Sequence, residues 1–146
     1  MIMKTKNFLT AIVCFVLLSA STLVMADEKN IDKKSMSFSI GTYIDVLKSG
    51  YSADYASIIA YDAKFNINRN GNTVTHYKTE ELKFNNNKNN AATQNCNVSY
   101  KVITASDNYA LVTVSMQYEN FTRENIVSLS KIKDSWKITE VNSVFK

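Results

Sequence analysis

The spacing of apolar residues changes from a helical period to a strand period near Tyr61 and Asp62. Before this point, apolar side chains recur every three or four positions, and after it they alternate with polar ones. A chain whose helices precede its strands buries the helices against one face of the sheet. The sequence therefore predicts an α+β domain, with N-terminal helices packed on a curved antiparallel sheet.

The first helix is expected to begin after Ser35. Its apolar side chains fall on one face, at positions i, i+4, i+7, i+8 and i+11: Met36, Ile40, Tyr43, Ile44 and Leu47. Gly50 stands where a left-handed residue ends a helix. Ser52 is placed to cap a second short helix. The apolar side of that second helix is formed by Ala56, Ile59 and Ala60.

A hairpin and a third helix are predicted next. Residues 63–68 alternate between apolar and polar, and the Asn-Gly-Asn turn at 70–72 leads to a return strand at 73–77. Thr79, followed by two glutamates, predicts the start of a short helix. The helix is expected to end in an asparagine-rich loop at 85–90.

The C-terminal half predicts a meander of long strands at residues 93–106, 109–119, 123–133 and 136–145. One face of the second strand is strongly apolar and the other, which carries Thr113, is mixed. The apolar face must line the helices. The mixed face is either solvated or covered by a second copy of the sheet, and we expect a homodimer through the sheet.

Residues 1–26 have the composition of a secretory signal peptide. Lys4 and Lys6 precede an apolar run at 8–18, and Ala26 ends a small-residue cleavage site. A transmembrane anchor is the alternative, but it needs about 20 apolar residues, and the run is about 11 long. We expect an exported protein, periplasmic or secreted and without a membrane segment after cleavage. Its flexible lead spans residues 27–34 and its domain spans residues 35–146.

Removal of the signal changes the charge and the cysteine count. The chain has 17 basic and 13 acidic residues, and loss of Lys4 and Lys6 leaves 15 basic residues against 13 acidic ones. This balance does not predict nucleic-acid binding. Cys14 is also lost, so Cys96 has no partner for an intramolecular disulfide, and we interpret it as a buried packing residue.

Four segments together resemble a known family. They are Tyr43-Ile-Asp-Val-Leu-Lys-Ser-Gly50, Ser57-Ile-Ile-Ala-Tyr-Asp-Ala-Lys-Phe65, Lys78-Thr-Glu-Glu-Leu82 and Leu129-Ser-Lys-Ile-Lys-Asp-Ser-Trp-Lys-Ile138. Their order resembles the nuclear transport factor 2-like superfamily, with its cystatin-like cone, and within it the small secreted bacterial lumazine-binding-like and SnoaL-like group. The resemblance implies a pocket between the long helix and the concave sheet. It does not imply one function, because the same cone hosts isomerases, cyclases, dehydratases and binding modules.

Few residues are candidates for chemistry in such a pocket. A carboxylate or histidine base would be Asp62, at the junction into the first strand, or His76, the single histidine. The alternative interpretations are a turn acid and a residue of an edge strand. Tyr100 is a candidate hydrogen-bond donor to a ligand or an enolate, and the alternative is a structural tyrosine that fills the core with its hydroxyl at the rim. A lone histidine without ligand-spaced partners predicts no metal site.

Candidate ligand contacts are Tyr43, Tyr100, Thr113 and Trp136, for a small apolar or aromatic ligand and without a cofactor. For Trp136, core packing is the alternative. The first hypothesis is a non-catalytic exported domain that binds a small molecule or a protein partner. The second is an enzyme of the isomerase or cyclase type, which requires an acid or histidine and a second polar group to converge in one cavity. A protein inhibitor would need anchor residues in its long loop, and residues 85–90 lack them.

Overall fold

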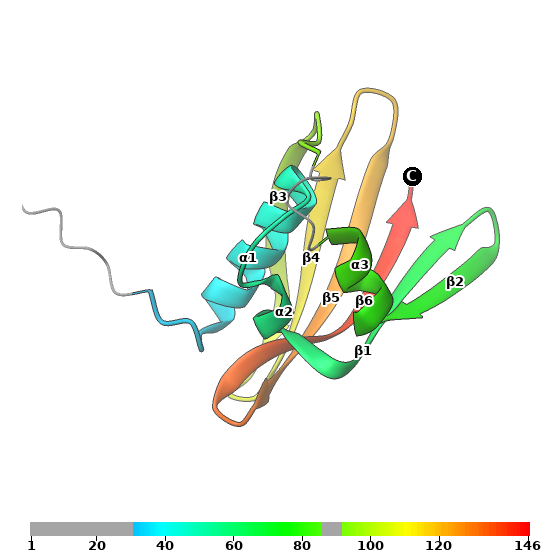
Figure 1. Ribbon diagram of the computed structural model, residues 1–146. Coiled ribbons are helices and arrows are strands. Elements are labelled where there is room, and N and C mark those ends of the chain that lie inside the picture. Colours follow the sequence, from blue (N-terminus) through cyan, green and yellow to red (C-terminus); the bar gives the residue numbers. More distant parts are fainter. Residues whose placement is uncertain (1–30, 86–91) are drawn as a thin grey trace, which may run out of the picture.

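The computed structural model describes residues 31–85 and 92–146, in which six strands form a single sheet and three helices lie over one of its faces (Figure 1). The helices are α1 (Met36–Ser49), α2 (Tyr55–Ile58) and α3 (Lys78–Asn85). The strands are β1 (Ile59–Arg69), β2 (Asn72–Tyr77), β3 (Asn97–Ala105), β4 (Tyr109–Gln117), β5 (Thr122–Ile132) and β6 (Ser135–Phe145). The predicted signal peptide at 1–26, residues 27–30 of the lead and most of the asparagine-rich loop lie outside the described residues.

Helix α1 begins and ends where the sequence predicts. The Ser35 hydroxyl accepts a hydrogen bond of 3.1 Å from the Phe38 amide and caps the first turn. At the other end, Gly50 adopts a left-handed φ of 74°, and its N–H donates to the Val46 carbonyl. No helix among the described residues is long and apolar enough to cross a membrane.

Helix α2 is shorter than predicted. Ile59 and Ala60, which were expected on its apolar side, already belong to β1, because Ile59 pairs with Ile138 of β6. Pairing with a neighbouring strand overrides the local helical spacing. A shift of register between Ile59 and Lys64 then marks a β-bulge, and in this stretch Tyr61 and Asp62 face solvent.

The strand order in the sheet is β2-β1-β6-β5-β4-β3. Neighbouring strands are antiparallel except β1 and β6, which are parallel. The antiparallel hairpin and meander were predicted, whereas the parallel pair that joins them into one mixed sheet was not. Strand β3 begins at Asn97, four residues later than expected, so Cys96 precedes it. Cys96 is only partly buried, which corrects its interpretation as a core residue.

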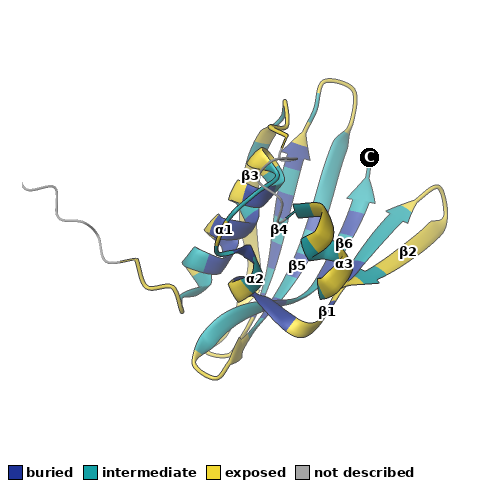
Figure 2. Cartoon of the chain, viewed as in Figure 1, coloured by how far each residue is buried: buried dark blue, intermediate teal, exposed yellow. Residues whose placement is uncertain are grey.

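The main core lies between α1, α2 and the concave face of the sheet (Figure 2). Its fully buried side chains include Tyr55, Ile58, Val112, Leu129 and Ile138. The apolar face predicted for β4 is buried at Ala110, Val112, Val114 and Met116, as expected. Burial of this face against the helices supplies most of the stability of a domain of this size.

The opposite face of the sheet is polar and carries no helix among the described residues. Thr75 donates to the side-chain oxygen of Asn66, and the Asn66 amide donates to Glu140 and Asn142. These bonds of 2.8–2.9 Å run across β2, β1 and β6. The two faces therefore differ: one is an apolar core and the other a hydrogen-bonded polar surface.

Candidate functional site

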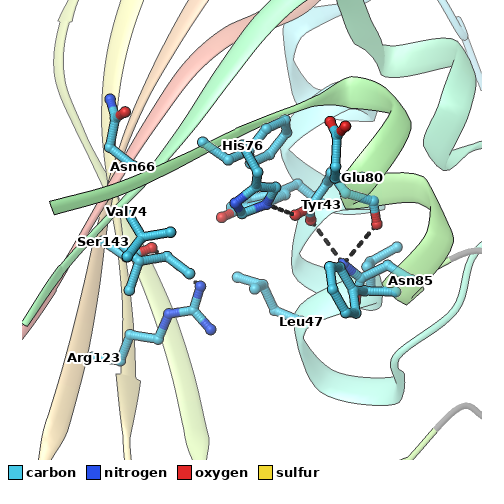
Figure 3. A pocket seen from close by; sticks show the side chains of 14 residues that line it. Tyr43, Leu47, Asn66, Val74, His76, Glu80, Asn85, Arg123 and Ser143 are labelled. Atoms are coloured by element: carbon cyan, nitrogen blue, oxygen red, sulfur yellow. Dashed lines mark hydrogen bonds and ion pairs between the residues drawn. The ribbon is translucent and has the colours of Figure 1, made fainter.

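The concave face is not completely filled, and a cavity of about 530 Å³ lies beneath α3 (Figure 3). Its helical wall includes Tyr43, Val46 and Leu47 from α1 and Glu80, Glu81, Phe84 and Asn85 from α3. Its strand wall includes Phe65 and Ile67 from β1, Val74 and His76 from β2, Arg123 from β5 and Ser143 from β6. About half of the lining residues are polar or charged, but the surface that they expose to the cavity is mainly apolar, as is usual in a ligand pocket.

His76 and Glu81 are in hydrogen-bond contact on one side of this cavity. The His76 Nε2 and Glu81 Oε2 atoms are 2.7 Å apart, and both side chains are less than one-fifth exposed. The imidazole stacks on Phe65, with ring centroids 5.4 Å apart, and meets Phe84 edge-on. These contacts fix both the position and the plane of the imidazole ring.

The Glu81 carboxylate connects α3 to the rest of the domain. Its Oε1 atom accepts hydrogen bonds from the Tyr55 hydroxyl at 2.6 Å and the Asn85 amide at 2.8 Å, while Oε2 contacts His76. Burial, followed by the charge of Glu81, raises the pKa of Tyr55 well above its usual value. Tyr55 therefore remains a neutral donor, and the carboxylate has three donors around it.

Tyr43 contributes a second phenol to the helical wall. Burial raises the pKa of Tyr43, the charge of Arg123 lowers it, and the charge of Glu81 raises it, with a net upward shift. The phenol therefore stays protonated and can donate a hydrogen bond. Its ring stacks with that of Tyr55 at a centroid distance of 6.5 Å.

Arg123 projects from β5 into the cavity and lies across it from α3 (Figure 3). Its Nε donates to the Asn125 side-chain oxygen at 3.0 Å, and its Nη2 donates to the Ser143 hydroxyl at 3.1 Å. Ser143 in turn donates to the same Asn125 oxygen at 2.6 Å. Asn125 and Ser143 are almost completely buried, so this network holds the guanidinium in one orientation.

The structure brings two of the predicted site residues, Tyr43 and His76, into this cavity. Asp62 is exposed at the bulge of β1 and lies outside it. Thr113 alternates along β4 with the buried Val112 and Val114, so it lies on the polar face of the sheet, where its neighbour on β3 is Lys101. None of Asp62, Thr113, Tyr100 and Trp136 lines the cavity.

Tyr100 and Trp136 have other environments. Tyr100 is on the helix side of β3, opposite Val114, but it is 55% exposed. Trp136 packs against the core, and its carbonyl accepts a 2.8 Å hydrogen bond from the Ser39 hydroxyl. Its amide donates to the carbonyl of Lys34, which ties the described part of the lead to β6.

Sequence reasoning missed Glu81 and Arg123. Glu81 was interpreted only as part of a helix start. For Arg123 a signal was present, because Arg123 and Asn125 precede Val127 and Leu129 at alternate positions of one strand. Two polar residues in line with core positions indicate a polar pocket at that end of the strand.

Within residues 31–85 and 92–146, no group of three His, Cys, Asp or Glu side chains is placed to hold a metal ion. The arrangement can hold an organic ligand between apolar surfaces, with the Arg123 cation and the His76 imidazole on the strand wall and the Tyr43 phenol on the helical wall.

Comparison with known families gives a match to the family described as "Putative lumazine-binding", over residues 32–146. The chain belongs to this lumazine-binding-like family. This confirms the resemblance carried by the four sequence segments, and the lumazine-binding-like domain has the α+β fold of the nuclear transport factor 2-like superfamily. Comparison with curated protein sequences gives no match.

Solved structures support the fold alone. A nuclear transport factor 2-like protein of unknown function from Silicibacter pomeroyi is 10% identical, with a TM-score of 0.57, and 75% of this chain and 92% of that chain are covered. A similar protein from Methylobacillus flagellatus is 16% identical, with a TM-score of 0.54 and coverages of 75% and 88%. A third, from Shewanella baltica, is 8% identical, with a TM-score of 0.56 and coverages of 75% and 90%.

Proposed function

We propose that this protein is an exported, non-catalytic domain that binds a small apolar or aromatic molecule beneath α3. The observation that supports this most is the cavity of about 530 Å³, whose exposed surface is mainly apolar and whose lining includes several oriented polar groups. The family description, which refers to lumazine binding, is consistent with a small ligand. A cavity of this volume accommodates a molecule of two or three fused or linked rings.

Binding is favoured over catalysis by the contacts that the Glu81 carboxylate makes within the protein. It already contacts three donors, from Tyr55, Asn85 and His76. A general base must be able to reach a proton of the substrate, and both oxygens of this carboxylate are already engaged by donors of the protein. Glu81 thus serves to hold α3 and His76 in place.

Native mass spectrometry of the protein purified from the envelope of its host tests this function. We expect a population with the mass of the mature chain plus a retained small molecule. The matched control is Val74→Trp, because Val74 lines the cavity but is 62% exposed. Its enlargement fills the pocket without disturbing the main core. Identical spectra without an adduct in both proteins would contradict a tightly bound ligand.

An enzyme of the isomerase or cyclase type is the second candidate, and the 2.7 Å contact between His76 and Glu81 favours it. A carboxylate that accepts the proton of Nε2 leaves Nδ1 of a neutral imidazole as a proton acceptor. In heavy water, an enzyme of this kind would exchange a carbon-bound proton of the retained molecule for deuterium. The exchange would disappear in His76→Asn, whereas a binding domain would show no exchange in either protein.

Export and self-association are parts of the same proposal. Sequencing of the mature N-terminus would find Asp27 as the first residue if residues 1–26 are removed. We propose that two copies associate through the face of the sheet opposite the helices, where Leu111, Ile126 and Val144 lie half-buried among polar side chains. The same native spectra report the mass of a monomer or a dimer, and a monomer at micromolar concentration would contradict the dimer.

A further inference from the structure

We infer that the ligand of this cavity carries a carboxylate or similar anionic group, which the Arg123 guanidinium binds while an apolar body lies against Phe65 and Val74. This inference rests on the proposed binding function and adds to it the chemical class and the orientation of the ligand. It follows from the donors that Arg123 still has available, from the absence of a counter-ion for it among residues 31–85 and 92–146, and from the negative charge on the opposite wall.

Arg123 has more donors than the protein uses. A guanidinium presents five N–H groups. Described residues accept from two of its nitrogens, Nε and Nη2, through the Asn125 oxygen and the Ser143 hydroxyl. Both acceptors lie on the sheet side, so the remaining donors face the cavity, toward Leu47 of α1 in Figure 3. Such a planar set of donors suits a two-oxygen anion.

The charge of Arg123 is not neutralised by the described part of the chain. Among residues 31–85 and 92–146, ion pairs join Lys33 to Asp54 and Lys146 to Glu124, and the Glu81 carboxylate contacts His76. None involves Arg123. A partly buried charge without a counter-ion is unfavourable, and two almost completely buried polar residues, Asn125 and Ser143, are used to orient it. Binding of an anion would compensate this charge.

A second arginine reinforces the positive side of the cavity. The guanidinium carbons of Arg69 and Arg123 lie 5.7 Å and 5.8 Å from the centroid of the Phe145 ring. Cation–π contacts hold both groups close to one ring. Arg69 is exposed and lies outside the cavity lining, so it adds positive potential near the cavity without making contact inside it.

The opposite wall fixes the orientation of the ligand. Glu80 and Glu81 lie on α3, so negative charge is concentrated on the helix side of the cavity. Glu80 accepts a hydrogen bond from the Tyr77 amide, and Glu81 has its three donors. An anionic head is therefore repelled from α3 and attracted to Arg123. The apolar body then occupies the space between Phe65, Val74 and Phe84.

A matched pair of fluorescent probes tests this inference. 1-Anilinonaphthalene-8-sulfonate is an aromatic anion, and N-phenyl-1-naphthylamine has the same rings without the sulfonate. We expect the anion to bind at least about tenfold more weakly to Arg123→Gln than to the unmodified protein, since the variant loses charged hydrogen-bond donors to the sulfonate. The neutral probe should change by less than about twofold.

The control variant is Lys101→Gln, which removes the same charge from the polar face of β3. It should change the affinity of neither probe. Val74→Trp should weaken the binding of both, which places them in the cavity. In the unmodified protein, affinity for the anion should fall as salt is raised from low to physiological concentration, and affinity for the neutral probe should not. This last comparison does not depend on the folding of any variant.

The outcomes separate the two proposals. If both probes bind equally, with the same salt dependence, and Arg123→Gln has no effect, the ligand is not anionic, and the binding function stands. If neither probe binds to the unmodified protein, both the binding function and the anionic ligand are contradicted. Weaker binding of the anion to Lys101→Gln than to Arg123→Gln would show that it binds on the outer face, which would also overturn the inference.

Discussion

The two parts of the concave face are covered in different ways. Under α2 and most of α1 the space is filled, and α1 alone buries five side chains, of which Tyr43 and Val46 also border the cavity: Ser39, Ile40, Thr42, Tyr43 and Val46. Over β1 and β2 the cover is α3, which buries no side chain completely. A helix with a full apolar stripe packs closely on the sheet, whereas a short, charged helix held by hydrogen bonds does not. The cavity therefore exists because α3 has no apolar stripe to fill the space over β1 and β2.

Polar contacts replace apolar packing where α3 meets the domain. Glu81 anchors the helix to Tyr55 and His76, and Lys78 donates to the carbonyls of Ala56 and Ile59 at 2.8 Å. Directional bonds can position a helix at a distance from the sheet, because they do not require close contact of side-chain surfaces. The following predictions test whether stability belongs to the α1 region and binding to the α3 region.

The largest effect on stability is expected in the filled region. Leu129→Ala removes a completely buried side chain and should lower the free energy of unfolding by about 2–5 kcal/mol. Val74→Ala, at the cavity, should lower it by less than about 0.5 kcal/mol. Urea denaturation followed by circular dichroism measures both. Equal losses would show that the α3 region is packed as tightly as the core.

The second effect concerns the anchor of α3. Glu81→Gln removes the charge that accepts from three donors, and we expect a loss of about 1–3 kcal/mol in the free energy of unfolding together with faster amide hydrogen exchange in α3. Glu80→Gln makes the same chemical change one residue away, where a single hydrogen bond to the Tyr77 amide is affected. A larger effect for Glu80→Gln would contradict the role assigned to Glu81.

A third, smaller effect is expected at the start of α1. Ser35→Ala removes the hydroxyl that accepts from the Phe38 amide and should reduce the free energy of unfolding by about 1 kcal/mol. Binding of the neutral naphthylamine should be unchanged, because Ser35 lies outside the cavity. If its affinity fell along with stability, the two regions would not be independent.

The smallest effect is a pH dependence. Because burial raises the pKa of Tyr43, its neutral form is favoured in the folded state, and the associated stability is present below the unfolded pKa of about 10 and lost as pH rises above it. For one such tyrosine, the free energy of unfolding falls by about 0.7 kcal/mol between pH 9.5 and 10.5. Tyr43→Phe should remove that part of the loss. An unchanged pH profile in the variant would show that Tyr43 ionises freely.

The sequence predicted the region under α1 and α2 better than the cavity region under α3. The stripe from Met36 to Leu47, the helix end at Gly50 and the alternation in β4 are local signals, and the structure confirms all three. The parallel pairing of β1 with β6 has no local signal, because it joins residues about 75 positions apart, such as Phe65 and Val141. It is this pairing that brings β2 and α3 to the same side as Arg123.

The candidate site could be predicted only in part for the same reason. His76 was identified because it is the single histidine, and Tyr43 because it lies on the apolar helix face. Glu81 and Arg123 acquire their roles from partners distant in the chain, Tyr55 and Ser143. Asp62 was predicted as a candidate pocket acid from its place before the first strand. In the structure, the bulge of β1 turns it to solvent.

The most direct test of the account is a nuclear magnetic resonance titration of the ¹⁵N-labelled protein with the neutral naphthylamine. We predict that the amide signals that shift most belong to α3, β2 and Phe65 and Ile67 of β1, while those of β3 and of the polar face of β4 stay in place. Shifts confined to β3 and the polar face, or no saturable shift at all, would contradict the claim that the cavity beneath α3 is the binding site.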